Sequence, residues 1–291
     1  MTQGRLSKFS ASLTAVLIAA LSVTAVASAH TGEWAKFNYC PSTTAGVRKC
    51  LQAVTSGGEI VLGKKTVPIV HPVTLQGGFS AENEETGIST MFAATNGETL
   101  TKAAQAVPGG LLGIVPPEGS PPLVKALSAF FFENGLTGVN ATLELAKPAS
   151  EIQISQINLV SQEGVAMKLP VKVHLENPFL GKSCYIGSST SPIIWNLTTG
   201  TTSPPAPNKP LAGFGGLLEF KEEAQIAQIN GSKLVDNAWS APSANGCGGI
   251  LSFLVNPIIN SQIGLPAAAG TNTSILNNTI TIALAEQVNL H

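Results

Sequence analysis

The chain has 291 residues, of which 11% are charged, and its formal net charge is −1. Nucleic-acid binding normally requires a basic patch rich in arginine, and Arg48 is the only arginine after residue 29, so we expect no nucleic-acid partner. The sequence lacks the HExxH zinc motif, the GxxxxGK[ST] phosphate loop and the GxSxG nucleophile elbow, which predicts no cofactor and favours a non-enzymatic protein.

Residues 1–29 have the three parts of a secretory signal peptide. Arg5 and Lys8 form a positive start, a largely apolar run covers 10–26, and Ala27-Ser28-Ala29 is a small-x-small cleavage site. The alternative is an uncleaved anchor, which would need about 20 apolar residues; this run is shorter and contains Ser and Thr. We therefore predict cleavage after Ala29, secretion to the extracellular space or the cell envelope, and no transmembrane span afterwards.

The cysteines also favour export. All four lie after the predicted cleavage site, at Cys40, Cys50, Cys184 and Cys247. An even number of cysteines in an oxidising compartment favours disulfides. Three pairings are open, and proximity along the chain favours Cys40–Cys50 with Cys184–Cys247. A metal site is the weaker alternative, because the sequence has no CxxC and no histidine beside a cysteine.

Many short segments rich in Val, Ile and Thr, separated by Gly and Pro, predict a mainly β protein. Gly63-Lys64-Lys65 separates two such segments and predicts a hairpin. Within residues 171–176 the odd positions are apolar and the even positions, including His174, are polar, which indicates a strand with one wet face. The predicted strands cover 59–62, 66–70, 73–76, 139–146, 151–159, 165–176, 193–198, 216–221, 224–229 and 278–285.

Helical segments are fewer, at 122–131 and 250–263. Residues 198–210 are Pro/Thr-rich and uncharged apart from Lys209, which predicts an extended, exposed loop. The favoured Cys184–Cys247 pairing would bridge this loop. We therefore expect a single β-rich domain over residues 30–291, namely a β-sandwich or distorted barrel with one or two short helices.

His30 offers one specific chemical hypothesis. Cleavage after Ala29 would expose the amine and the ring of His30, and both nitrogen types suit copper. A second imidazole would complete the histidine brace of copper-dependent polysaccharide monooxygenases. His174 is available for this role on the wet face of its strand, and His71 and His291 are the other candidates. No other part of the chain matches those enzymes, so this alternative depends on the histidines alone.

Four segments together resemble a family of secreted bacterial proteins of unknown function. They are KKTVPIVHPVTLQGG (64–78), ATNGETL (94–100), LENPFLGKSCYIGSSTSP (175–192) and GCGGILSFLVNPIIN (246–260). The resemblance spans most of the chain after residue 29 and implies bacterial export. It implies no reaction, ligand or site residue.

These features favour a secreted or envelope-associated binding, adhesion-like or structural module of unknown ligand. A carrier of an apolar ligand is the alternative, and it requires an apolar cavity between the sheets. The segment SAFFFENG (128–135) has three consecutive phenylalanines. They pack in the core at a helix end, or at least one contacts a partner or a lipid.

Overall fold

The structure is a computed structural model, and it describes residues 29–133, 136–223 and 225–291. The predicted signal peptide lies outside the described residues, apart from Ala29. Within those ranges, every helix is too short or too polar to cross a lipid bilayer.

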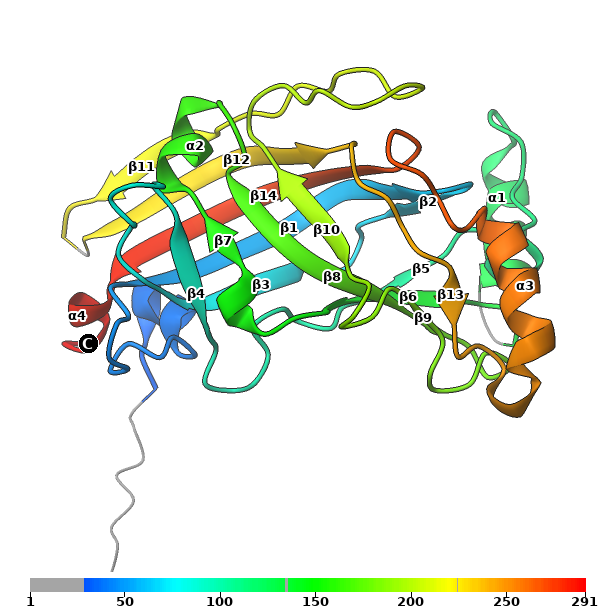
Figure 1. Cartoon of the computed structure of the whole chain (residues 1–291), viewed down its shortest axis with the longest axis horizontal. Helices are drawn as coiled ribbons and strands as arrows, with labels where there is room; N and C mark the ends of the chain where they lie inside the picture. Colours follow the sequence, from blue (N-terminus) through cyan, green and yellow to red (C-terminus); the bar gives the residue numbers. More distant parts are fainter. Residues whose placement is uncertain (1–28, 134–135, 224) are drawn as a thin grey trace, which may run out of the picture.

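The molecule is built from two antiparallel sheets joined through one strand (Figure 1). The first sheet has the order β11 (Leu217–Lys221), β12 (Ile226–Asp236), β14 (Thr273–Leu284), β1 (Lys49–Leu62) and β3 (Val73–Phe79), with β2 (Lys65–Pro68) also paired to β1. The second sheet contains β7 (Gln153–Ile154), β8 (Met167–Glu176), β6 (Asn140–Leu145) and β5 (Ala104–Ala106), with β9 (Tyr185–Ile186), β10 (Ile193–Leu197) and β13 (Ala244–Asn245) beside them. The joining strand is β4 (Ser89–Ala93), which pairs with β3 at one end and β7 at the other. The predicted mainly β, sandwich-like class is confirmed, and the sheets do not form a closed barrel.

The strand β1 begins at Lys49, ten residues before the start of the predicted strand 59–62. Two glycines near its centre resemble a turn in the sequence. Gly57 and Gly58 lie where the register between β1 and β14 shifts. Gly58 has a φ of +109°, and an added Cβ would lie 2.0 Å from the carbonyl oxygen of Ile275. Glycine is therefore required here by a bulge inside a continuous strand. The short strands β4 and β5 were not predicted.

The predicted hairpin is present between β1 and β2. Leu62 pairs with Lys65, so Gly63 and Lys64 form a two-residue turn. Gly63 has a positive φ of +57°, which suits the first position of such a turn.

The helices are α1 (Pro122–Ser128), α2 (Gln156–Ser161), α3 (Ser252–Ile263) and α4 (Ala285–Val288). Short 3-10 segments are η1 (Gly32–Phe37), η2 (Gly110–Leu112), η4 (Ala149–Glu151) and η5 (Gly249–Leu251), and a π segment, η3 (Ala129–Glu133), continues α1. There are thus more helices than the one or two expected. The strand predicted over 151–159 is wrong: only β7 forms, and α2 follows it. The Ser155 side chain accepts a hydrogen bond from the amide of Asn158 at 3.4 Å and caps that helix.

The Pro/Thr-rich loop is exposed only in its second half. Thr198, Thr199 and Thr202 are buried, whereas most residues of 203–210 are exposed. The Thr199 hydroxyl donates to the carbonyl oxygens of Asn158 and Leu159 at 3.0 Å each. The Thr198 and Thr202 hydroxyls accept the amide protons of Gly200 and Leu211. The prediction of a fully exposed loop is corrected accordingly, because Thr199 is bound to α2 and the other two threonines are bound within the loop.

Two disulfides link the chain, in the pairing that proximity favoured. Cys40 is bonded to Cys50, and Cys184 is bonded to Cys247. Disulfides persist in oxidising compartments, so the two bonds indicate that the chain functions in one. The main buried core draws on both sheets, and a second, smaller core surrounds Cys40 and Cys50 beneath η1 and α4.

Candidate functional site

An apolar cavity of about 100 Å³ lies between the two sheets. Its lining is apolar apart from Thr55, Lys65, Gln105 and Asn278. The first sheet contributes side chains such as Ala53, Leu75, Leu234 and Leu276, and the second contributes Leu143, Met167, Leu169, Val173, Leu175, Trp195 and Leu197. A concave, mostly apolar space with a few polar groups is the usual form of a small-molecule site.

The alternation of β8 builds one wall of this cavity. Leu169, Val173 and Leu175 are buried and line the space, whereas Lys172 and His174 are only partly buried and face the other way. Successive side chains of a strand point to opposite faces. The predicted wet and dry faces of this strand are therefore confirmed.

Three of the four polar lining residues have protein partners. Gln105 Oε1 accepts the amide protons of Val70 and His71 at 2.8 and 2.9 Å, and Gln105 Nε2 donates to the His71 carbonyl oxygen at 2.7 Å. The Thr55 hydroxyl donates to Asn278 Oδ1, and Asn278 Nδ2 donates to the Leu276 carbonyl oxygen at 2.9 Å. These groups are satisfied by the fold itself.

Trp195 provides an aromatic surface in the cavity wall. It is 1% exposed, and its ring lies 6.0 Å from that of Trp239 with the planes tilted by 58°. The indole nitrogen of Trp195 is buried, and no described residue accepts its hydrogen. Trp195 was not singled out from the sequence, because the alternation of residues 193–198 does not reveal a cavity.

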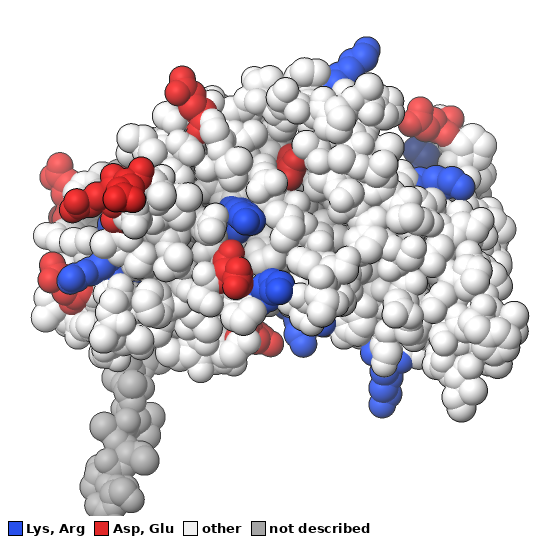
Figure 2. Space-filling model, viewed as in Figure 1, with Lys and Arg blue, Asp and Glu red and all other residues white. Residues whose placement is uncertain are grey.

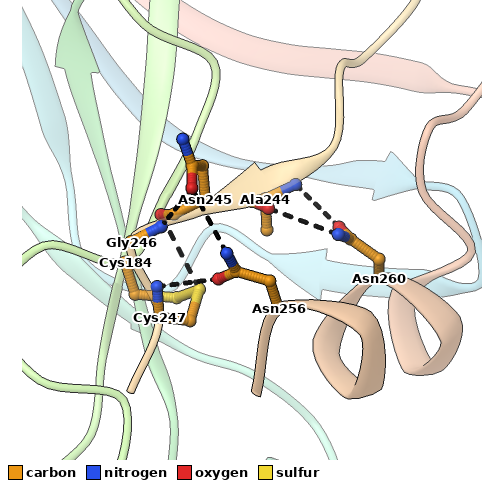
Figure 3. The surroundings of a disulfide bond; sticks show 7 residues. All are labelled: Cys184, Ala244, Asn245, Gly246, Cys247, Asn256 and Asn260. Atoms are coloured by element: carbon orange, nitrogen blue, oxygen red, sulfur yellow. Dashed lines mark hydrogen bonds between the residues drawn. A yellow bond between two sulfur atoms is a disulfide. The ribbon is translucent and has the colours of Figure 1, made fainter. Parts of the chain in front are cut away.

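The Cys184–Cys247 disulfide anchors the start of α3 at one side of the cavity (Figure 3). The amide of Cys247 donates to Asn256 Oδ1 at 2.9 Å. Asn260 Oδ1 accepts from the amide of Ala244 at 2.7 Å, and Asn260 Nδ2 donates back to the Ala244 carbonyl oxygen at 3.2 Å. Two asparagines of α3 therefore fix the helix to β13 and to the disulfide segment.

The C-terminal end of α3 contacts the β1–β2 hairpin. The amide of Lys64 donates to the Ile263 carbonyl oxygen at 2.7 Å. The Ile263 side chain lines the cavity. This helix is therefore held across the end of the sandwich where the hairpin and α1 also lie (Figure 1).

Several large apolar side chains are exposed at this end. Figure 2 shows no charged side chain over α3 on the face in view. Phe130 is 68% exposed, so the SAFFFENG segment presents at least one phenylalanine outside the core; the Phe131 side chain lies outside the described residues. Other exposed apolar side chains of this end are Leu112, Leu123, Leu127, Ile250, Phe253, Leu254 and Ile258.

The structure does not bring His30 and His174 together. His30 lies beside η1, where its amide donates to Asn38 Oδ1 at 2.6 Å. His174 stacks on Tyr185 with ring centroids 4.4 Å apart, and its Nδ1 lies 3.9 Å from Glu144 and 3.7 Å from Glu176. In Figure 1, η1 is at the left end of the molecule, whereas β6 and β9, which flank His174, are in the right half.

The other two histidines have different surroundings. The backbone of His71 is bound by Gln105. The His291 ring stacks on Trp34, with centroids 4.3 Å apart. Across the described ranges, no group of three or more His, Cys, Asp or Glu side chains could hold a metal ion.

No family model, no curated protein and no solved structure matches this chain.

Proposed function

We propose that this protein is a non-enzymatic carrier that binds a small apolar molecule in the cavity between its sheets. The observation that supports the proposal is the apolar lining, in which three of the four polar residues are already satisfied by the protein. A cavity of this composition discriminates between ligands by apolarity and size, because it offers few hydrogen bonds to a ligand.

The free-energy cost of an empty cavity favours a bound ligand. On the scale measured for core substitutions, a void of 100 Å³ costs a fold about 2 kcal/mol. A ligand that fills the space restores the missing dispersion contacts. Dry cavities of similar size, lined by Leu, Ile and Phe, bind small apolar molecules.

The cavity volume limits the ligand. A water-sized group needs roughly 10–15 Å³ of cavity, so on the order of eight chain atoms fit. A narrow alkyl chain or a single ring satisfies this limit, whereas a bulky polycyclic molecule requires the walls to move.

A chain-length series of n-alcohols tests the proposal by titration calorimetry. Each methylene that enters the cavity should tighten binding about fourfold, and the gain should stop near eight carbons. Fluorescence of Trp195, in a variant with the other two tryptophans replaced by phenylalanine, should change in parallel. Binding without dependence on chain length would contradict an apolar cavity site.

Two leucines give a matched pair of variants. Leu169 and Leu51 are both 3% exposed, but only Leu169 lines the cavity. Both Leu169→Ala and Leu51→Ala should destabilise the fold by about 2–5 kcal/mol. Only Leu169→Ala enlarges the cavity, and it should extend the optimum to longer alcohols. Ala53→Leu fills the same space and should weaken binding of every member of the series.

We further propose that the carrier acts outside the cytoplasm, either secreted or at a bacterial cell envelope. The two disulfides and the resemblance to secreted bacterial proteins support this location. Mass spectrometry of the protein exported by its own host should give an amino terminus at His30. A retained segment 1–29 would contradict the predicted cleavage.

A further inference from the structure

Among the described residues that line the cavity, Lys65 is the one that is charged. It lies on β2, where Lys65 and Val67 are partly buried while Thr66 and Pro68 are exposed. Val67 also lines the cavity. The period of two in a strand therefore places the Lys65 side chain on the same inner face as Val67.

The Lys65 ammonium lies where the hairpin, η2 and α3 meet. A Cβ built on Gly113, just after η2, would lie 3.1 Å from Lys65 Nζ and 3.0 Å from Gln262 Oε1 of α3. Lys65 is only partly buried, while Gln262 is exposed. The ammonium group thus lies at the boundary between the apolar cavity and solvent.

This ammonium has no acidic partner in the described part of the chain. Lys64, its neighbour, differs: its Nζ donates to the Ser261 carbonyl oxygen at 3.2 Å. The salt bridges of the described residues involve Lys36, Lys102, Lys172, His174 and Lys221, and none involves Lys65. Burial lowers the pKa of Lys65, and no nearby carboxylate counteracts this effect.

A partly buried, unpaired ammonium costs free energy that an anion placed beside it would offset. The described residues beside it supply no such anion: Gln262 is neutral and Lys64 carries a further positive charge. A ligand with an anionic group would supply this partner. The ligand must also be apolar over most of its length, because Thr55, Gln105 and Asn278 are satisfied and the indole nitrogen of Trp195 is the one further polar group among the described lining side chains.

We propose that the ligand is a single-chain amphiphile with an anionic head group, whose head pairs with Lys65 and whose alkyl chain lies in the cavity. This inference rests on the proposed carrier function and names its ligand class. A carboxylate and a phosphate ester share the required chemistry.

The test compares octanoate, octyl phosphate and octanol in titrations of the full-length mature protein. Lys65→Met keeps the length of the side chain and removes its charge. It should weaken octanoate binding roughly tenfold to a hundredfold, the range for a hydrogen bond to a charged group. Octanol binding should change much less, because octanol carries no charge. Lys64→Met is the matched control and should change octanoate affinity less than about threefold.

Each outcome has a distinct meaning. If octanol binds but Lys65→Met leaves octanoate affinity intact, or if Lys64→Met costs as much, the role of Lys65 is overturned while the carrier function stands. If none of the three probes binds the wild-type protein, the carrier function itself fails. A preference for octyl phosphate or for octanoate that disappears in Lys65→Met supports the inference and identifies the head group.

Discussion

Removal of each disulfide by paired Cys→Ala substitution should separate their structural roles. Cys184 and Cys247 are 63 residues apart in the chain, and Cys40 and Cys50 are 10 apart. A crosslink stabilises the fold mainly by restricting the unfolded chain, and the effect grows with the logarithm of the loop length. The chain-entropy relation gives about 4.3 kcal/mol for the longer loop and about 2.7 kcal/mol for the shorter one.

The functional consequences should differ as well. Cys247 lies next to α3, whose last residue lines the cavity. The core around Cys40 and Cys50 shares no residue with the cavity lining. Loss of the Cys184–Cys247 bond should therefore weaken octanol binding, whereas loss of the Cys40–Cys50 bond should not.

Urea unfolding followed by circular dichroism measures the first effect, and calorimetry with octanol measures the second. The variant lacking Cys184–Cys247 should lose about 1.6 kcal/mol more stability than the variant lacking Cys40–Cys50. Equal losses would show that loop entropy does not determine the stabilities. Unchanged octanol affinity in both variants would refute the claim that the disulfide positions α3 over the cavity.

Two further predictions concern residues outside the disulfides. Gly63→Ala should destabilise the protein by several kcal/mol more than Gly87→Ala in the same urea assay. Both glycines have a positive φ, but only at Gly63 would the new Cβ meet a backbone oxygen, that of Ile263 at 2.2 Å. Equal losses of stability in the two variants would contradict this prediction. Burial raises the pKa of Asp236, although its carboxylate accepts amide protons from Asn196 and Ala238. The folded state therefore holds this proton more tightly than the unfolded state, so the stabilising contribution is present below the ordinary Asp pKa and is lost as pH rises through the raised value. The stability of Asp236→Asn relative to wild type should accordingly increase as the pH rises from about 3 to 7. A stability difference between the two proteins that does not vary with pH would contradict the raised pKa.

Much of the fold could be predicted from local patterns. The alternation in 171–176 identified the wall of the cavity, and Gly63-Lys64 identified the hairpin that carries Lys65. The predicted secondary structure is wrong where the same residue type occurs in two kinds of structure. Gly57-Gly58 resembles a turn but forms a bulge, and Ser155 follows strand-like residues but caps a helix.

The candidate site could not be predicted in this way. The sequence predicts Lys65 in the turn rather than in β2, so it gives no inward direction for this side chain. It predicts Trp195 as an ordinary strand residue. Both become part of one site only because β2 and β10, which belong to different sheets, face the same cavity.

The sequence by itself determined the mainly β class, the wet and dry faces of β8 and a disulfide pairing favoured by proximity, because each depends on spacing along a short segment. Only the tertiary structure decided that His30 and His174 lie apart, that α3 covers one end of the sandwich, and that Lys65 borders an apolar cavity with no acidic partner among the described residues. These facts depend on distances between segments far apart in the chain, and such distances are set by the packing of the two sheets rather than by any local pattern of residues.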